Sequence, residues 1–237
     1  MPEKLQPGGS YAQTLGRGVR VLEVLAVAQV PLTLAQIADR LHVNRSVAYR
    51  LVRTLIAHRL IEVATDDRYA LGLGLITLAR GVDTDLRRIA HPILVALSED
   101  LKVTAVLNAV DGDEVVCLLS AEPKSSGLRV AYREGLRYPL DQGASGIAIL
   151  SARSPKPHER GSVTRAREVG YAMSDGELEA DTTAISVPIR RLDGGCRSTI
   201  TLLSATSQRP DEERAAKELA AAARTIADAL EAGHAFP

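Results

Sequence analysis

Polar and cationic side chains recur at helical spacing near position fifty of the chain. One face of a predicted helix carries the residues at i, i+3, i+4 and i+7: Ser46, Tyr49, Arg50 and Arg53. The opposite face is apolar: Val47, Ala48, Leu51 and Leu55. Arginine, serine and tyrosine donate hydrogen bonds to phosphate oxygens and base edges. We therefore expect the recognition helix of a helix-turn-helix, a motif whose partner is double-stranded DNA.

The residues before this helix predict the rest of the motif. A first amphipathic helix carries Leu15, Val19, Leu22 and Leu25 on its apolar face. Thr33 and Gln36 form a capping box that begins a second helix. The apolar face of this second helix contains Leu34, Ile37, Ala38 and Leu41. After a short turn, Asn44 is a good N-cap for the third helix, which we expect to end near His58.

The periodicity changes after Leu60. Segments 61–63 and 69–71 predict two short strands around a turn at Asp66 and Asp67, a hairpin known as a wing. Arg68 is expected at or near the tip, where a cation reaches the flanking backbone or the minor groove. A winged helix is therefore favoured over a plain helix-turn-helix.

These elements give a set of candidate DNA-binding residues: Thr33, Asn44, Arg45, Ser46, Tyr49, Arg50, Arg53 and Arg68. Some also have a structural explanation, since Thr33 and Asn44 are caps and Tyr49 can pack across a helical turn. The chain as a whole has 29 basic and 29 acidic residues, but residues 14–60 contain seven arginines against Glu23 and Asp39. This local surplus favours DNA contacts confined to the N-terminal module.

Composition limits the other classes. A chain of 237 residues that is 46% hydrophobic has material for one or two domains. Neither a membrane-length apolar run nor a secretory segment is present, so we expect a cytoplasmic protein without a membrane partner. Cys117 and Cys196 lie far apart and predict buried free thiols, with no metal site. The run Gly72-Leu73-Gly74 lacks the third glycine of a dinucleotide fingerprint, and no cofactor is expected.

The remainder predicts a mixed second domain. Gly81 and Pro92 interrupt a helical stretch, which predicts a linker helix followed by another helix. Strands are expected at 103–110, 114–120, 128–133, 184–191 and 197–204, with a turn at 193–195. Helices are expected at 146–152 and 211–231. An antiparallel sheet flanked by helices is an α+β arrangement that can cup a small ligand.

Five segments in this order resemble IclR-type transcriptional regulators: TLAQIADRLHVNRSVAYRLVRTL, RYALGLGLITLA, GLRYPLDQGASGIAIL, GYAMSDGELEADTTAISVPI and the closing hairpin with Ser204. The resemblance extends over residues 14–231. It implies a disordered tail (1–13), a winged helix-turn-helix (14–71), a linker helix (72–88) and a GAF-like effector-binding domain (89–237). It further implies a homodimer or dimer of dimers on palindromic operators.

The resemblance also implies an effector pocket, at positions that here are Val130, Tyr138, Ala144, Ser145, Ser174, Asp175, Ala184, Leu202 and Ser204. Ser145 and the backbone N–H groups at the start of the following helix are suited to hold an anion. Three positions depart from the family pattern, with Ile147 in place of a lysine, Ala184 in place of a cysteine and Ser174 in place of an acidic residue. Either the ligand differs from that of other members, or the pocket has lost its ligand.

We therefore expect a DNA-binding regulator, a repressor rather than an activator, whose operator affinity depends on a small organic acid or aromatic effector. One alternative is a ligand-independent regulator with a vestigial pocket. A second is a serine hydrolase with its nucleophile in segment 143–147, which lacks the final glycine of G-x-S-x-G. Neither His91 nor His158 has an evident orienting partner for such chemistry. A third is a winged helix that contacts only proteins.

Overall fold

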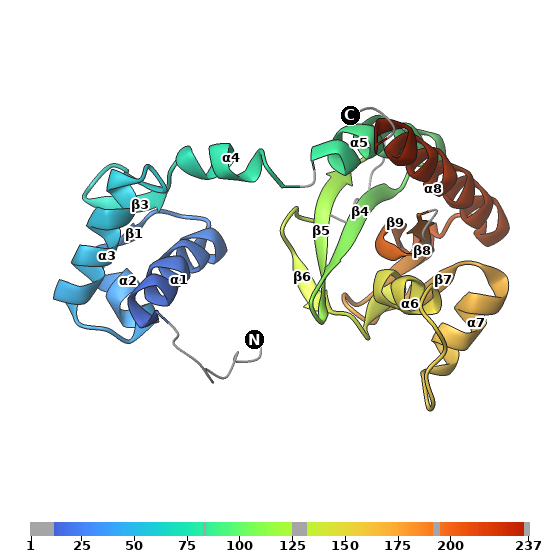
Figure 1. Cartoon of the computed structure of the whole chain (residues 1–237), viewed down its shortest axis with the longest axis horizontal. Helices are drawn as coiled ribbons and strands as arrows, with labels where there is room; N and C mark the ends of the chain where they lie inside the picture. Colours follow the sequence, from blue (N-terminus) through green and yellow to red (C-terminus); the bar gives the residue numbers. More distant parts are fainter. Residues whose placement is uncertain (1–11, 83, 125–131, 192–194, 235–237) are drawn as a thin grey trace. The chain divides into compact units, whose positions relative to one another are not determined.

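The protein is described from a computed structural model, and the structure describes residues 12–82, 84–124, 132–191 and 195–234. The chain divides into two compact units, Met1–Val82 and Asp83–Pro237. The division falls inside the segment 72–88 for which a linker was predicted. Figure 1 labels the helices and strands of each unit.

The described part of the N-terminal unit is a winged helix-turn-helix. Its helices are α1 (Gln13–Ala28), α2 (Leu34–Leu41), α3 (Arg45–Ala57) and α4 (Gly74–Ala79). Its strands are β1 (Leu32–Thr33), β2 (Ile61–Val63) and β3 (Arg68–Leu71). They form an antiparallel sheet in the order β1-β3-β2. The structure confirms the predicted second and third helices and the wing, whose turn residues Asp66 and Asp67 both have positive φ.

The first residues of α2 and α3 are capped differently. Thr33 donates its backbone N–H to Gln36 Oε1 at 2.9 Å, and its Oγ1 accepts the Gln36 N–H at 3.3 Å, which confirms the capping box. Asn44 occupies the N-cap position of α3 as predicted, but its side chain makes no capping hydrogen bond. The Asn44 side chain is exposed and remains available to another partner.

Helix α1 buries only part of the predicted face, since Leu25 lies in the core and Leu22 packs against it. Val21 and Leu25 are buried in the core of the helix-turn-helix. Leu15, in contrast, is 70% exposed and Val19 is 47% exposed, so the prediction is wrong for these two residues. The helix has apolar residues on more than one side, and periodicity alone does not decide which side packs against the other helices. Helix α1 begins at Gln13, the last residue of the predicted tail 1–13. Residues 1–11 lie outside the described part.

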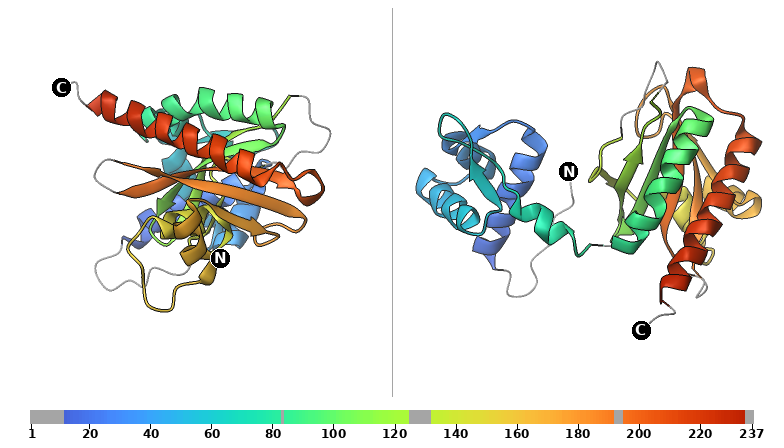
Figure 2. Two further views of the ribbon diagram at one scale, coloured as in Figure 1. Left: turned by 90° about the vertical axis from the view of Figure 1, so that its right-hand side faces the viewer. Right: turned by 90° about the horizontal axis from the view of Figure 1, so that it is seen from above.

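The C-terminal unit is built around an antiparallel sheet. Its helices are α5 (Thr84–Leu101), α6 (Gly143–Ser151), α7 (Gly161–Val169), the 3-10 turn η1 (Thr206–Gln208) and α8 (Glu212–His234). Its strands are β4 (Thr104–Asp111), β5 (Glu114–Ala121), β6 (Arg137–Pro139), β7 (Ala172–Asp175), β8 (Thr182–Arg190) and β9 (Cys196–Ala205). The sheet order is β6-β5-β4-β9-β8-β7. Helices α5 and α8 cover one face, and α6 and α7 cover the other (Figures 1 and 2). The predicted α+β class is therefore confirmed.

Several predicted boundaries in this unit are wrong. Of the third strand predicted at 128–133, residues 128–131 lie outside the described part, while Tyr132 and Arg133 lie in a loop. The helix predicted from residue 146 begins at Gly143. Helix α7 and the short strands β6 and β7 were not predicted. The turn predicted at 193–195 falls largely on residues that the structure does not describe.

Pro92 lies inside α5 and does not interrupt it, contrary to the prediction. Proline removes one backbone donor from a helix. Ala90 and Leu94, on either side of it, are 0% and 1% exposed, and this burial holds the helix against the sheet. Gly81 does mark a break, because α4 ends at Ala79 and α5 begins at Thr84. The segment predicted as one linker helix over 72–88 is thus two helical pieces.

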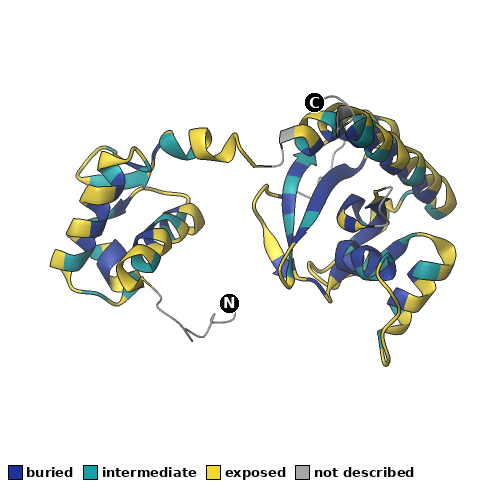
Figure 3. Cartoon of the chain, viewed as in Figure 1, coloured by how far each residue is buried: buried dark blue, intermediate teal, exposed yellow. Residues whose placement is uncertain are grey.

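Each face of the six-stranded sheet packs into its own hydrophobic core, and the strands β4, β8 and β9 are largely buried (Figure 3). A bulge in β5 switches the side of the sheet that its side chains face. Leu107 is paired with Leu119, while its neighbour Asn108 is paired with Cys117. As a result Cys117 lies in the core on the α6 side, and Leu119 lies in the core on the α5 and α8 side.

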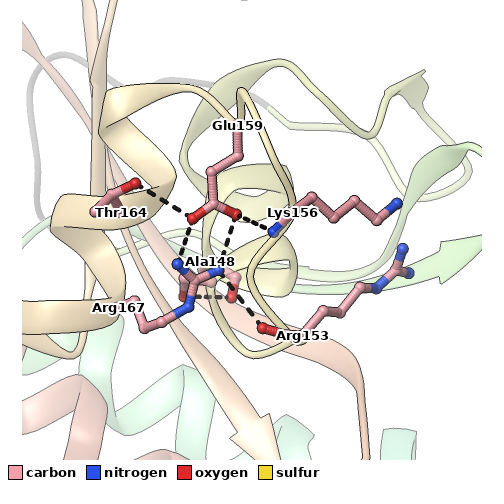
Figure 4. Close-up of polar contacts among 7 residues, drawn as sticks. Ala148, Arg153, Lys156, Glu159, Thr164 and Arg167 are labelled. Atoms are coloured by element: carbon pink, nitrogen blue, oxygen red, sulfur yellow. Dashed lines mark hydrogen bonds and ion pairs between the residues drawn. The ribbon is translucent and has the colours of Figure 1, made fainter.

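Helix α7 is tied to the loop before it by a charged network (Figure 4). Glu159 pairs with Arg167 and accepts the Thr164 hydroxyl at 3.2 Å and the Lys156 backbone N–H at 3.3 Å. Arg167 also donates to the carbonyl of Arg153. The Arg167 guanidinium lowers the pKa of Glu159 to about 2. These contacts hold the loop that precedes α7 against the helix.

Cys117 and Cys196 are buried free thiols, as predicted. Burial raises the pKa of Cys117 to about 12 and also raises that of Cys196. Within the described ranges, no three histidine, cysteine or acidic side chains are grouped as metal ligands would be. In the same ranges, every helix is too short or too polar to cross a bilayer.

Candidate functional site

Helix α3 presents a continuous polar face to solvent. Its buried side consists of Ala48, Leu51, Val52 and Leu55. Six of the eight predicted DNA-binding residues are exposed at its start or along its outer face: Asn44, Arg45, Ser46, Tyr49, Arg50 and Arg53. The two-sided helix predicted from the sequence is therefore present. The core fixes its rotation about its own axis, which decides which side chains point outward.

The cations of this face have no acidic partner among the described residues. The guanidinium of Arg53 lies 5.8 Å from the centre of the Tyr49 ring, a cation–π contact that orients both side chains. In the part of the chain that the structure describes, Arg45, Arg50 and Arg53 form no ion pair with an acidic residue. Three uncompensated arginines on one exposed helix face are suited to bind phosphate groups.

The two remaining predicted DNA contacts are engaged within the protein. The Thr33 hydroxyl accepts a hydrogen bond in the capping box. Arg68 is the first residue of β3 and donates to the carbonyl of Pro31 at 3.3 Å. Thr33 and Arg68 are also directly paired across β1 and β3. The Arg68 side chain thus ties the wing to Pro31, and the Thr33 side chain caps α2, whereas the polar side chains of α3 point outward.

Five of the nine predicted effector positions lie on the α6 side of the large sheet. These are Tyr138, Ala144, Ser145, Ser174 and Ala184. All but Ser174 are less than 9% exposed. Tyr138 lies in the edge strand β6, Ser174 in the edge strand β7 and Ala184 in the neighbouring strand β8. The other two lie in the first turn of α6. The structure thus brings together residues up to 46 positions apart, as the difference between 184 and 138 shows.

Three of the other four positions, Leu202, Ser204 and Asp175, do not join them. Leu202 lies in the core on the opposite face, and Ser204 follows it on that face because side chains alternate along β9. Asp175 is exposed and accepts hydrogen bonds from Thr183 and Arg209. Val130 lies outside the described residues. The prediction of Leu202 and Ser204 as pocket residues is therefore wrong for this geometry, in which Thr199, Thr201 and Leu203 face α6.

A buried cluster of neutral polar groups lies where β4, β8, β9 and α6 meet. Asn108 Nδ2 donates to Ser145 Oγ at 3.0 Å and to Thr201 Oγ1 at 3.2 Å. Ser145 and Thr201 are 2.9 Å apart, and Thr201 donates to Ser186 Oγ at 2.8 Å. All four residues are at most 3% exposed. Asn108, Thr201 and Ser186 were not predicted as site residues, although polar residues inside apolar strands were a signal for them.

Two atoms of this region lack partners among the described residues. They are Asn108 Oδ1 and Thr199 Oγ1, and both residues are 0% exposed. Asn108 and Thr199 are paired across β4 and β9, so their side chains lie on the same face. A buried polar atom without a hydrogen bond is costly, and such atoms in native proteins require an explanation.

Two tyrosines separate this cluster from a surface pocket of about 430 Å³. The Tyr132 and Tyr138 rings meet edge to face, with centroids 6.2 Å apart. Burial raises the pKa of Tyr138 to about 12, against the opposing effect of its hydrogen bond to Ser145. Burial also raises the pKa of Tyr132. Both phenols are therefore neutral at physiological pH. The two tyrosines line the pocket together with residues that include Leu178 and Glu179.

The start of α6 is held by the loop between β7 and β8. Gly143 donates its backbone N–H to Glu177 Oε2 at 2.8 Å, and Ala144 donates to Ser174 Oγ at 2.9 Å. Arg160 donates to Glu177 Oε1 at 2.8 Å. The N–H groups predicted to hold an anion thus already have partners within the chain.

Ser145 lacks the surroundings of a hydrolase nucleophile. Its hydroxyl is 3% exposed and contacts Asn108 and Thr201, and no hydrogen bond joins it to a described histidine. His91 lies in α5, and His158 lies in the loop before α7. These contacts explain the hydroxyl as part of a packed polar cluster.

Comparison with known proteins agrees with this architecture. The IclR helix-turn-helix domain matches residues 14–64, and the C-terminal domain of bacterial IclR transcriptional regulators matches residues 81–161 and 160–232. The chain is 23% identical over 229 residues to the HTH-type transcriptional regulator XynR of Escherichia coli, covering 86% of this chain and 90% of that protein.

Solved structures show the same fold. An IclR transcriptional regulator from Alicyclobacillus acidocaldarius is 29% identical, with a TM-score of 0.79 over 93% of this chain and 99% of that one. An IclR homologue from Microbacterium hydrocarbonoxydans, solved with 4-hydroxybenzoate, is 26% identical, with a TM-score of 0.82 over 92% of this chain and 99% of that one. The matched domains cover most of this chain and agree with its winged helix and its antiparallel sheet. The chain therefore belongs to the IclR family of DNA-binding transcriptional regulators.

Proposed function

We propose that this regulator binds operator DNA through the exposed face of α3, and that a small organic molecule bound on the α6 side of the C-terminal unit changes its operator affinity. The observation that carries the DNA-binding part is the set of exposed arginines on α3. They form no ion pair with a described acidic residue, and the opposite side of the helix is packed. Arg45, Arg50 and Arg53 supply the charge, and Asn44, Ser46 and Tyr49 supply neutral hydrogen-bonding groups. Arg68 holds the wing to Pro31, and Thr33 caps α2.

The effector part of the proposal is supported by the buried polar cluster and by the adjoining pocket. A pocket of about 430 Å³ is large enough for a small aromatic molecule. The relative solved with 4-hydroxybenzoate supports a ligand of this size. We propose further that the protein acts in the cytoplasm as a homodimeric repressor, because a palindromic operator presents one half-site to each of two recognition helices.

Fluorescence anisotropy with the full chain tests the DNA-binding part. The duplex probes tile the intergenic DNA beside its own gene, and a shuffled duplex of equal length serves as the control. We expect one probe to bind more tightly than the shuffled duplex. Its affinity should fall steeply as salt is raised from about 50 to about 200 mM, because neutralised phosphates release counterions. A winged helix that contacts only proteins would bind no duplex under any of these conditions.

A further inference from the structure

A tight turn contributes to the wall of the pocket of about 430 Å³. Its first and last residues, Arg133 and Leu136, both line this pocket. Leu136 donates its backbone N–H to the Arg133 carbonyl at 3.1 Å. Gly135, at the third position, has a φ of 83°, a conformation that glycine adopts without strain. The second position of the turn is occupied by Glu134, whose carboxylate is thereby fixed next to the pocket.

The turn is hydrogen-bonded to β5 beside the bulge of that strand. Gly135 donates its N–H to the Cys117 carbonyl at 2.8 Å, and Cys117 donates its own N–H to the Leu136 carbonyl at 2.9 Å. The next residue, Leu118, is the extra residue of the bulge, because Cys117 and Leu119 are paired with successive residues of β4. A displacement of the turn therefore reaches the bulge through a single residue of β5.

Arg87 of α5 contacts both the turn and the bulge. Its Nη1 donates to the carbonyl of Leu118, and its Nη2 donates to Glu134 Oε2 at 2.9 Å. A planar guanidinium can hold two acceptors in this way, whereas an ammonium group acts as a point charge. Arg87 lies in the first turn of α5, which begins at Thr84, directly after the division between the two units. The pocket wall is thus connected to the point where the chain enters the C-terminal unit.

The contribution of this pair to stability is too small to explain the arrangement. The Arg87 and Glu134 side chains are 38% and 49% exposed, and exposed ion pairs add little to the free energy of unfolding. The neighbouring Arg88 pairs with Asp85 of its own helix at 3.3 Å. Arg87 instead joins α5 to residues that are 31 and 47 positions away in the sequence. Its contacts fix the position of the helix start.

We propose that Arg87 is the positioning residue through which a ligand in this pocket changes operator affinity. A ligand that packs against Arg133 and Leu136 displaces the turn. Glu134 moves with the turn, and the bulge moves through Cys117, so both acceptors of Arg87 shift together. The start of α5 follows, and with it the segment that leads to the winged helix. The proposal rests on the effector part of the proposed function and names the residue that transmits its effect.

Fluorescence anisotropy of the full chain on its operator duplex, with and without saturating 4-hydroxybenzoate, tests this proposal. This probe is the molecule with which one relative was solved. For the wild type we expect operator affinity to change by at least about fivefold, the lower end of typical coupling. Arg87→Gln and Glu134→Gln should each remove most of this change. Arg88→Gln removes the same group from the neighbouring position and should keep it.

Two further measurements on the same variants separate positioning from general damage. Circular dichroism verifies that each variant is folded, and calorimetry should show that each binds the probe about as tightly as the wild type. Hydrogen–deuterium exchange follows the turn at 133–136 and the amides of residues 88–91, which are bonded to the first turn of α5. The probe should change exchange in both segments of the wild type, but only in the turn of Arg87→Gln.

The proposal for Arg87 alone is overturned if Arg87→Gln or Glu134→Gln keeps the wild-type response, or if Arg88→Gln loses it equally. A wild-type protein that binds the duplex but does not respond to the probe contradicts the effector part of the proposed function, and the role of Arg87 with it. A wild-type protein that binds no duplex contradicts the DNA-binding part.

Discussion

Arg50, one of the proposed DNA contacts, has its orientation fixed by its neighbours on the helix. Leu51 and Val52 are 7% and 1% exposed and pack in the core, so Arg50 is directed to solvent. Arginine suits this position because its charge persists at every physiological pH and its planar group binds phosphate or guanine at two points. Tyr49 and Arg53, unlike Arg50, contact each other through a cation–π interaction.

We predict that Arg50→Ala weakens operator binding by at least about tenfold, which corresponds to the loss of one good base or phosphate contact. Arg20→Ala is the matched control, because Arg20 is also exposed but lies on α1. Anisotropy titrations at several salt concentrations distinguish the two kinds of contact, since loss of a phosphate contact lowers the salt slope by about 1. Equal weakening by both variants would show that only net charge matters.

At the scale of elements, Thr33 and Asn44 begin neighbouring helices but have different tasks. Thr33 makes both hydrogen bonds of a capping box, whereas the Asn44 side chain makes none. We predict that Thr33→Ala lowers the free energy of unfolding by about 1 kcal/mol, and that Thr33→Ser restores most of it. Asn44→Ala should cost less stability but weaken operator binding. Urea denaturation gives the unfolding free energy of each variant, and anisotropy gives its operator affinity. If Thr33→Ala weakened operator binding and Asn44→Ala lowered stability, the roles proposed for the two residues would be contradicted.

The network around Glu159 predicts how α7 responds to acid. The pKa of Glu159 is about 2 in the folded protein, below its ordinary value of 4.5. A lowered pKa stabilises the folded state at pH values above the ordinary pKa, and this stabilisation is lost as the pH falls from about 4.5 towards 2. We therefore predict that wild type is more stable than Glu159→Gln at pH 6 and that the difference shrinks with acid. Urea denaturation between pH 6 and pH 2 measures the difference in unfolding free energy between the two proteins. A difference that does not depend on pH would contradict the lowered pKa of Glu159.

Local signals predicted some elements well and could not predict others. The helix-turn-helix, the wing and the long hairpins have strong periodicity, caps or tight turns within a few residues. Helix α7 and strands β6 and β7 are short and largely polar. Distant contacts order them, such as that of Arg137 in β6 with Asp111, 26 residues away. Leu202 was predicted to line the pocket, and this prediction is wrong. The pairing of β9 with β4, and not the sequence of β9 itself, decides which of its residues face α6.

At the scale of the whole molecule, the segment after the wing is more apolar than a solvated helix requires. Leu73, Ile76, Leu78 and Val82 are 59–73% exposed. Their exposure supports the proposed homodimer, because a second copy would remove these side chains from water. We predict that the double change Ile76→Asp and Leu78→Asp shifts the protein from dimer to monomer in size-exclusion chromatography with light scattering. Thr77→Asp, on the same helix, should leave the dimer intact; a wild-type monomer would contradict the proposal.

The two units can regulate transcription only if their binding free energies are coupled. If a ligand in the C-terminal unit changes operator affinity by some factor, operator must change ligand affinity by the same factor. Coupling of 1–3 kcal/mol is typical and corresponds to roughly 5- to 150-fold. We take 4-hydroxybenzoate as the probe, because one relative was solved with it. We predict that saturating operator lowers the affinity for this probe by the factor by which the probe lowers operator affinity. Calorimetry with and without operator, and anisotropy with and without the probe, measure the two factors independently. Probe affinity that is identical on and off operator would mean that the pocket does not control the recognition helices, and the protein would then be a regulator whose DNA binding is independent of this ligand.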